Sequence, residues 1–391
     1  MPSRCDQLNL DDAFVQAVER KCGLEILADS HSRGLYSTDA SIYQVSPLGV
    51  VLPERIEQVG ELLKLCSQYG IPVLPRGGGT SLAGQCVNQA LVIDVSKGCC
   101  SLLNVVHQDR VCSVEPGITI DDLNDEIRKF GLFFAPDPST ARQANIGGCI
   151  GNNAAGVHSV LYGRTSDNVI AIDACLADGT QVRFEKGASE HDPIVREITN
   201  RVIKVVRKNA DSIRQRFPKT MRRSSGYQLD AILDQLEACE WNPAGVNLAP
   251  LLCGSEGTLA MTVSATLNLH PVPQCKGLAV LSFDELDEAV EVVSAILQLN
   301  PAGIELLDDL IMDLARGNAQ CAPYLDLLPN ANARAVLYVE FFGENSDSIG
   351  ASFEKLKDVV PGIPIREYSD QAHMENAWNL RKAGEPLLHA I

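Results

Sequence analysis

The 391-residue sequence lacks the segments that would direct it into or across a membrane. No apolar run approaches the roughly 20 residues that a membrane helix requires. The N-terminus turns polar at once and offers no apolar stretch followed by a small-residue cleavage site. We therefore expect a cytoplasmic protein with no transmembrane segment, either free or peripheral to the inner face of the membrane.

Positive charge is scarce. The sequence has 33 Lys and Arg against 50 Asp and Glu, which gives a formal net charge of −17. This charge repels phosphate backbones and anionic lipid headgroups, and no run of Lys and Arg is long enough to reverse it locally. Nucleic acid is therefore not an expected partner.

Paired metal ligands are also absent. None of the 13 cysteines forms a C-x-x-C pair, and Cys99 and Cys100 are too close for an ordinary disulfide or a zinc knuckle. We expect reduced, mostly buried thiols and no iron–sulfur cluster of the usual ferredoxin spacing. The seven histidines include no H-x-H or H-x-x-x-H pair, so we predict no bound metal.

Apolar periodicity indicates alternating strands and helices, and the length suits two domains. The first part shows helical spacing at 55–69 and 192–217, a helix that Thr119 caps, and strand patterns at 72–74, 91–95, 111–114, 169–176, 180–184 and around 254–269. Residues 134–163 are irregular and rich in Gly, Pro, Asn and Ser, and a long segment of this kind usually binds a ligand.

A second domain is expected after Pro271-Val272-Pro273. Its predicted order is strand 278–283, helix 284–299, strand 334–341 and helix 346–360, which suits an antiparallel sheet backed by helices.

The clearest local signal is the run Pro75-Arg76-Gly77-Gly78-Gly79-Thr80-Ser81-Leu82-Ala83-Gly84-Gln85. Successive backbone N–H groups can face outward in such a loop and cradle a pyrophosphate. It is not a Walker loop, because Gln85-Cys86 follows Gly84, and it lacks the G-x-G-x-x-G spacing. Taken alone, a plain structural turn is the alternative.

This run resembles the phosphate-binding loop of the FAD-binding domain shared by vanillyl-alcohol oxidase and para-cresol methylhydroxylase. Three further stretches resemble the same family in order and spacing. They are 136–140 with 145–159 and 162–165, then 224–230, then 252–260.

The resemblance implies a set of FAD-binding residues. They are Pro75, Arg76, Gly77, Gly78, Gly79, Thr80, Ser81, Gly84, Gln85, Pro136, Asp137, Pro138, Ser139, Thr140, Ile146, Gly147, Gly148, Gly151, Asn152, Asn153, Gly156, His158, Tyr162, Gly163, Glu256, Gly257 and Thr258.

Several of these residue types suit a flavin. Glycines at 147, 148 and 151 allow the backbone to approach the ring, and the side chains of Ser139, Asn152 and Asn153 can hydrogen-bond its polar parts. A capped turn is the alternative for the Asn pair. Glu256 would accept hydrogen bonds from the adenosine part of the cofactor or from turn amides.

Attachment of the flavin is expected to be non-covalent. Some members of the superfamily tether it through a histidine in the glycine loop, but Gly77-Gly78-Gly79-Thr80 contains none. His158 lies in another motif, where we expect a hydrogen-bonding partner and not an attachment point.

Within the family, the sequence looks most like glycolate oxidase, D-lactate dehydrogenase and D-2-hydroxyglutarate dehydrogenase, particularly the larger proteins that fuse this module to an iron–sulfur module. The segments that carry this match are Tyr162–Asn168 and Trp378–Lys382. The resemblance implies that Arg381 clamps the substrate carboxylate, for which a guanidinium is a natural bidentate receptor. A solvent-facing helix arginine is the alternative.

The implied fold is α+β. A short helical segment at 1–40 precedes a PCMH-type FAD-binding domain of two α/β subdomains at 41–273, and an incomplete ferredoxin-like FAD-linked oxidase cap follows at 274–391. Relatives continue beyond Arg381 into a segment with histidines and an acidic residue that often binds a divalent metal. Because the family's general base lies there, we expect this chain to be the N-terminal part of a longer protein.

The implied function is oxidation of a D-2-hydroxy acid by hydride transfer to flavin N5. The expected electron acceptor is a quinone, an electron-transfer protein or an iron–sulfur module outside this chain. Two alternatives stay open. One is an FAD-binding module that is inactive without a further segment or partner, and the other is a net non-redox condensation of the alkyldihydroxyacetonephosphate synthase kind.

Overall fold

The computed structural model describes residues 10–388, which form two compact units. Unit 1 comprises the chain up to Ala155 together with Arg164–His270. Unit 2 comprises Gly156–Gly163 and the chain from Pro271 onward. The short segment Gly156–Gly163 therefore leaves unit 1 and returns to it, which no local sequence pattern indicates.

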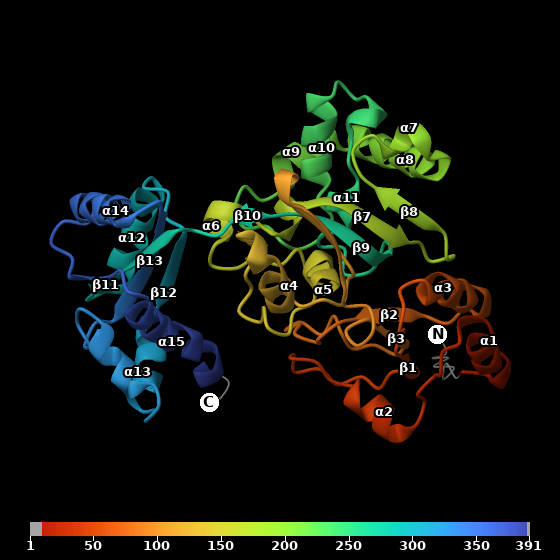
Figure 1. Cartoon of the computed structure of the whole chain (residues 1–391), viewed down its shortest axis with the longest axis horizontal. Coiled ribbons are helices and arrows are strands. Elements are labelled where there is room, and N and C mark those ends of the chain that lie inside the picture. The colour runs from red at the N-terminus through yellow and green to blue at the C-terminus, as the bar shows by residue number, and fades with distance from the viewer. Residues whose placement is uncertain (1–9, 389–391) are drawn as a thin grey trace. The chain divides into compact units, whose positions relative to one another are not determined.

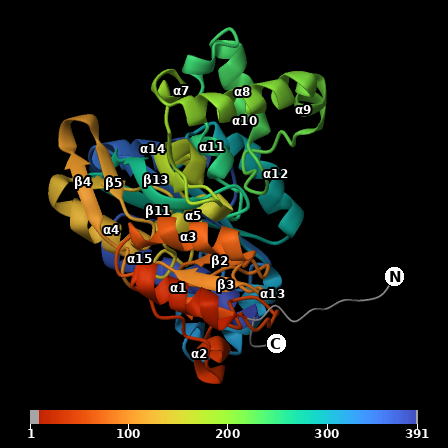
Figure 2. The same cartoon turned by 90° about the vertical axis from the view of Figure 1, so that its right-hand side faces the viewer.

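The N-terminal part of unit 1 is a three-stranded parallel sheet. Strands β1 (Gly49–Val51), β2 (Val73–Arg76) and β3 (Leu91–Asp94) lie in the order β1-β3-β2. Helices α1 (Asp12–Cys22) and α3 (Gln58–Tyr69) pack together beside it, as Figure 2 shows, and bury an apolar core with it. Helix α2 (Ser30–Leu35) precedes β1.

Helix α1 shows how local sequence sets these elements. Its N-cap residue Asp11 accepts a hydrogen bond from the Phe14 N–H at 2.6 Å, and it ends at Gly23, whose φ of 64° suits glycine. Phe14 and Val18, one turn apart, are fully buried. An apolar stripe between two capping residues thus defines a helix within the segment 1–40, for which the sequence predicted helical structure without giving its bounds.

The larger part of unit 1 is a five-stranded antiparallel sheet in the order β4-β5-β9-β7-β8. The strands are β4 (Leu102–Val106), β5 (Val111–Val114), β7 (Val169–Cys175), β8 (Gln181–Phe184) and β9 (Met261–Asn268). A two-stranded ribbon joins β6 (Leu132–Phe133) to β10 (His270–Pro271).

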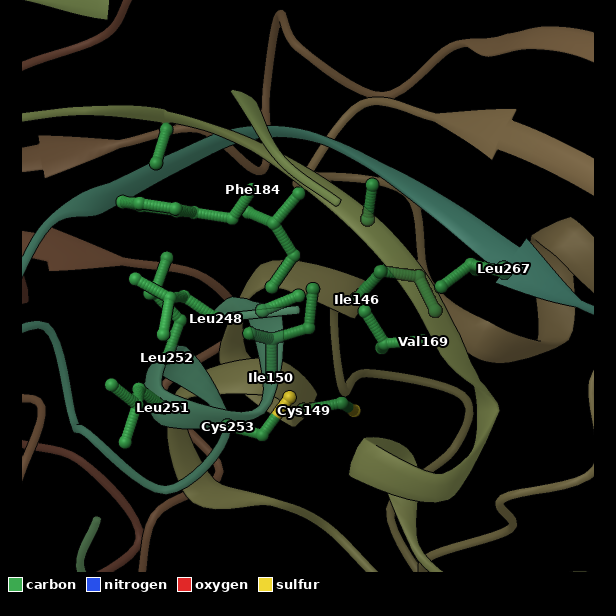
Figure 3. Packing of buried hydrophobic residues seen from close by; sticks show 14 of the residues in the cluster. Ile146, Cys149, Ile150, Val169, Phe184, Leu248, Leu251, Leu252, Cys253 and Leu267 are labelled. Carbon is green, nitrogen blue, oxygen red and sulfur yellow. The ribbon is translucent and has the colours of Figure 1, made fainter. Parts of the chain in front are cut away.

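Helices cover this sheet and supply much of its core. They are α4 (Ile120–Ile127), α5 (Ile146–Asn152), α7 (Ala188–His191), α8 (Pro193–Lys208), α9 (Ala210–Arg216), α10 (Leu229–Ala238) and α11 (Ala249–Leu252). Figure 3 shows Ile146 and Ile150 of α5 packed among Val169, Leu248 and Leu252. Truncating a buried isoleucine such as Ile150 to alanine costs about 2–5 kcal/mol.

Unit 2 is a four-stranded antiparallel sheet in the order β12-β13-β11-β14. Its strands are β11 (Cys275–Phe283), β12 (Gly303–Leu307), β13 (Ala335–Gly343) and β14 (Ile365–Tyr368). Helices α12 (Leu286–Leu297) and α14 (Ser346–Val359) bury one apolar core with it, and α13 (Asp309–Arg316) and α15 (Gln371–Leu388) bury another. The remaining helix of unit 2, α6 (Ser159–Tyr162), lies in the returning segment.

This strand order, with α12 and α14 as the crossover helices, is the ferredoxin-like arrangement that the resemblance implied. The α+β prediction is therefore confirmed, and so are most of the predicted strands and helices.

Two local predictions were wrong. Residues 134–163 contain helix α5, whose glycines hide the apolar period but whose Ile146 and Ile150 are buried. The strand pair expected around 254–269 is one strand, β9, because Gly254 and Gly257 have φ values of 89° and 75° and form a turn.

The described cysteines are all free, and most of them are buried. Burial raises the pKa of Cys149 and of Cys253 to about 12, which keeps these thiols neutral. In residues 10–388 no helix has the length and apolar character needed to cross a membrane.

Candidate functional site

A cleft in unit 1 brings together three of the four sequence motifs. Its walls are the glycine loop after β2, helix α5, and the turn between α11 and β9. Because the loop follows the carboxyl end of a parallel strand, it occupies the position where open α/β sheets commonly bind ligands.

Hydrogen bonds from the Arg76 side chain to backbone carbonyl oxygens hold the start and the end of the glycine loop. The guanidinium of Arg76 donates to the carbonyl oxygens of Tyr36, Thr38 and Cys86 at 2.8–3.1 Å. Gly79 has a φ of 70°, in the left-handed region that favours glycine. Arg76 therefore shapes the site through the loop backbone.

Asn145 links the loop to the opposite wall. Its side chain, 3% exposed, accepts a hydrogen bond from the Gly78 N–H at 2.6 Å and donates to the Gly117 carbonyl oxygen. Asn145 was part of a quoted motif but was not among the predicted site residues. Asn145 is the N-cap residue of α5 and makes no side-chain capping bond there, so its amide is available to Gly78 and Gly117.

Two adjacent glycines of α5 serve different purposes. A Cβ added to Gly147 would lie 2.7 Å from the Cβ of Pro116, so this glycine permits close packing within the fold. A Cβ added to Gly148 would meet no atom within 4 Å, and Gly148 lines the cleft. The missing side chain at Gly148 therefore leaves open space for a ligand.

The third wall is tied to α5 by backbone hydrogen bonds. The N–H groups of Gly254 and Glu256 donate to the carbonyl oxygens of Ile150 and Gly151 at 2.9 and 3.0 Å. The exposed Glu256 carboxylate accepts a hydrogen bond from Gln85 Nε2 at 3.5 Å, which joins this wall to the glycine loop. The two segments are 171 residues apart in sequence.

The motif at 224–230 packs against the turn between α11 and β9, on the side away from the cleft lining. A Cβ on Gly254 would lie 2.6 Å from the Ser224 carbonyl oxygen, and the hydroxyls of Tyr227 and Thr258 are 3.0 Å apart. Beside it, the buried Nδ2 of Asn153 has no hydrogen-bond partner among the described residues. The fourth motif thus packs beside the cleft without lining it.

The predicted site residues fall into three groups. Those that line the cleft are Pro75, Arg76, Gly77, Gly78, Gly79, Thr80, Ser81, Gln85, Pro138, Thr140, Gly147, Gly148, Gly151, Asn152, Glu256 and Gly257. Those of unit 1 outside its lining are Gly84, Pro136, Asp137, Ser139, Ile146, Asn153 and Thr258. Those of unit 2 are Gly156, His158, Tyr162, Gly163 and Arg381.

The cleft also has lining residues that were not predicted. They include Cys86, Val95, Pro116, Ser255, Met261 and Thr262. Burial raises the pKa of the Cys86 thiol, which favours its neutral form in this wall.

Unit 2 contains two carboxylates on neighbouring strands, one buried and one half-buried, each with a basic partner. Glu340 on β13 is 5% exposed, and its Oε2 lies 2.6 Å from His158 Nε2. Glu305 on β12 accepts hydrogen bonds from Nε and Nη2 of Arg381 at 2.7 and 2.5 Å. Opposite Glu305 on β13, Tyr338 is fully buried and its hydroxyl has no hydrogen-bond partner among the described residues.

The geometry of the cleft fits an elongated, phosphorylated cofactor. A glycine loop offers backbone N–H groups, Gly148 leaves space for close approach, and Asn152 adds an amide. The described residues include no group of three or more His, Cys, Asp or Glu that could hold a metal ion.

Comparisons with known proteins agree with this fit. Residues 47–185 match the family described as "FAD binding domain", and residues 272–390 match "FAD linked oxidases, C-terminal domain". The chain belongs to the FAD-linked oxidases, with an FAD-binding domain followed by the C-terminal domain of that family.

Its relatives are hydroxy-acid dehydrogenases and oxidases. D-2-hydroxyglutarate dehydrogenase of Escherichia coli (strain K12) is 31% identical over 96% of this chain and 38% of the relative. Glycolate oxidase subunit GlcD of Bacillus subtilis (strain 168) is 27% identical over 94% of this chain and 67% of the relative. Mitochondrial D-lactate dehydrogenase [cytochrome] 1 of Saccharomyces cerevisiae is 30% identical over 73% of this chain and 41% of the relative.

Solved structures show the same fold at lower identity. Alkyldihydroxyacetonephosphate synthase has a TM-score of 0.69 at 18% identity, covering 98% of this chain and 66% of that one. For p-cresol methylhydroxylase the TM-score is 0.66 at 15% identity, with 95% and 71% covered. The chain spans less than two fifths of the length of the D-2-hydroxyglutarate dehydrogenases that it matches.

Proposed function

We propose that this chain takes part in the FAD-dependent oxidation of a D-2-hydroxy acid to the 2-oxo acid. The observation that carries the proposal is the cleft of unit 1, where the glycine loop, helix α5 and the 254–257 turn meet around open space at Gly148. The relatives named for D-2-hydroxyglutarate, glycolate and D-lactate support the substrate class.

The proposed cofactor site is the cleft lining. Backbone N–H groups of the loop from Gly77 to Ser81, apart from the Gly78 N–H that Asn145 already engages, would hold the phosphates, and the polar side chain of Asn152 would contact the flavin part. Attachment is proposed to be non-covalent, because the glycine loop contains no histidine. Bound FAD would supply the hydride acceptor for the substrate Cα–H.

Arg381 is proposed to bind the substrate carboxylate. Its guanidinium has five N–H donors, and Glu305 engages only Nε and Nη2. The Glu305 carboxylate, with 13% of its side chain exposed, holds the guanidinium plane in one orientation. Donors on Nη1 and the second donor of Nη2 are therefore available to a carboxylate in a fixed geometry. A solvent-facing arginine, the alternative from sequence, would have no such half-buried acidic partner.

A second candidate function is an FAD-binding module that turns over only together with further polypeptide. The observation that favours it is that the D-2-hydroxyglutarate dehydrogenases are much longer than this chain. The general base of the reaction is not assigned to a residue of this chain under either proposal.

The proposed electron acceptor is a quinone, an electron-transfer protein or an iron–sulfur module outside this chain. The proposed location is cytoplasmic, with the inner face of the membrane as the surface at which a quinone would be met. Both proposals come from the resemblance.

The test is the visible spectrum of the FAD-loaded chain during anaerobic addition of D-lactate, glycolate and D-2-hydroxyglutarate. Bleaching by one D-acid, but not by its L-isomer, would establish the reaction. In the Arg381→Met variant the same acid should bleach FAD only at much higher concentration, because the carboxylate receptor is removed. A flavin spectrum that no acid changes would favour the second candidate.

A further inference from the structure

Basic residues gather in one stretch of unit 1, although the chain as a whole is strongly acidic. Ten of the 33 Lys and Arg lie between Arg196 and Arg223, together with only two acidic residues. The stretch covers α8, α9 and part of the loop after α9, and Figures 1 and 2 show both helices at one end of unit 1. The charges are spaced along helices, so the sequence shows no uninterrupted basic run.

Arg196 bonds to backbone carbonyl oxygens, and five further basic side chains have no acidic partner among the described residues. They are Lys204, Arg207, Lys208, Arg216 and Lys219, and all five are exposed. Ion pairs do engage Arg201, Arg214 and Arg223 of the same stretch. The surface therefore keeps a local excess of positive charge.

Apolar groups are exposed within the same surface. Met221 is 59% exposed and Val205 53% exposed. A shallow groove beside α8 is lined by Lys204, Lys208, Ile203 and Trp241, among others, and the guanidinium of Arg207 lies 4.7 Å from the centroid of the Trp241 ring. Basic side chains around Trp and protruding apolar groups are typical of surfaces that meet a lipid headgroup layer.

We propose that this surface, which we call the basic face (Arg196–Arg223 with Trp241), docks on an anionic membrane. At physiological ionic strength the Debye length is about 8 Å, so acidic residues elsewhere on the molecule are largely screened from a membrane that the basic face touches. Each Lys or Arg near an anionic surface strengthens binding by a factor of about five. The inference does not depend on the hydroxy-acid chemistry.

A bilayer fits the basic face better than a nucleic acid does. Both present phosphates, but only the bilayer offers an apolar phase in which exposed Met221 and Val205 become buried. A nucleic acid would leave these two side chains without a partner and would favour aromatic rings stacked on bases, whereas Trp241 already lies beside Arg207.

The first experiment measures co-sedimentation of the full chain, loaded with FAD, with vesicles at about 0.1 M salt, where the Debye length is about 10 Å. Vesicles of phosphatidylcholine and phosphatidylglycerol in equal amounts should bind the chain, and phosphatidylcholine alone should not. Binding should disappear at about 1 M salt, where the Debye length is about 3 Å. A chain that ignores the anionic vesicles, or binds a random DNA duplex more tightly than it binds them, would overturn the proposal.

Charge-reversal variants locate the surface. The set Lys204→Glu, Lys208→Glu and Lys219→Glu should weaken vesicle binding by at least about a hundredfold, from a factor of about five for each residue. The control set Lys64→Glu, Lys97→Glu and Lys355→Glu changes the net charge equally at exposed lysines elsewhere. An equal loss of vesicle binding in both sets would show that the net charge of the chain alone determines binding, and would overturn the assignment of the basic face.

Two further measurements keep the test decisive if the Glu variants fold poorly. Changing the same three lysines to Gln removes charge without introducing repulsion near the carboxyl end of α8, and should still weaken binding. The Trp378→Phe variant leaves Trp241 as its remaining tryptophan. Anionic vesicles should then shift the Trp241 emission to shorter wavelength; unchanged emission in a vesicle-bound chain would show that another surface makes the contact.

Discussion

Replacing Gly148 should separate folding of the chain from cofactor binding. Gly148 lies within α5, and a Cβ at this position would meet no atom within 4 Å. Glycine in a helix interior is less favourable than alanine by about 1 kcal/mol. Gly148→Ala should therefore raise the free energy of unfolding of the cofactor-free chain by up to about 1 kcal/mol.

The same methyl group should oppose FAD. The methyl group would project into the cleft from Gly148, which lines the cleft on the side of the glycine loop and on the side of the 254–257 turn. Inserting a methyl group into a packed contact costs about 1–3 kcal/mol. The FAD dissociation constant should therefore rise by about 5- to 150-fold. Gly148→Leu fills more of the space and should abolish binding at micromolar FAD.

Two assays check this prediction, namely urea unfolding of the cofactor-free chain and titration with FAD monitored by flavin fluorescence. Gly147→Ala is the matched control, because its Cβ would lie 2.7 Å from that of Pro116 and should destabilise the fold itself. If Gly148→Ala bound FAD as tightly as the unaltered chain, or unfolded at lower urea, the account of the cleft would be refuted.

Three other predictions concern residues away from Gly148. Asn145→Ala should lower stability by about 1–3 kcal/mol in urea unfolding and weaken FAD binding in the same titration, because the Gly78 N–H loses its acceptor; unchanged FAD affinity would contradict the bridging role. Arg381→Met should destabilise the chain by about 2 kcal/mol by leaving the Glu305 carboxylate without its cation, and adding Glu305→Gln should restore most of the loss in a double-mutant cycle. Burial and, to a smaller degree, a neighbouring arginine lower the pKa of His270 from its ordinary value of 6.5, so its neutral form stabilises the fold above pH 6.5 and this contribution falls as the pH drops below 6.5. His270→Gln should flatten that part of the profile of unfolding temperature against pH; an unchanged profile would exclude His270 as its cause.

The sequence predicted those parts of the fold and site that depend on local residue patterns. The glycine loop, the helix that Thr119 caps and the strands of the antiparallel sheets carry their own periodicity or turn residues, and each is present in the structure. Helix α5 was not predicted, because its glycines interrupt the apolar period and its stability comes from tertiary packing.

Long-range pairings could not be predicted in the same way. Asn145 meets Gly78 across 67 residues and Arg381 meets Glu305 across 76, and neither spacing has a local signature. The membership of Gly156–Gly163 in unit 2 depends likewise on contacts such as His158 with Glu340, 182 residues apart. The basic face was missed because a search for runs of charge does not detect charges that gather only when α8 and α9 fold.

The central claim, that the cleft of unit 1 binds FAD without a covalent bond, is tested most directly by identifying the flavin in the purified chain. The chain is saturated with FAD, freed of excess cofactor and precipitated with acid, and the flavin in the supernatant is identified by chromatography and quantified. The account predicts one FAD per chain in the supernatant, and none from Gly148→Leu. Flavin that stays with the precipitated protein, or no flavin from the unaltered chain, would contradict it.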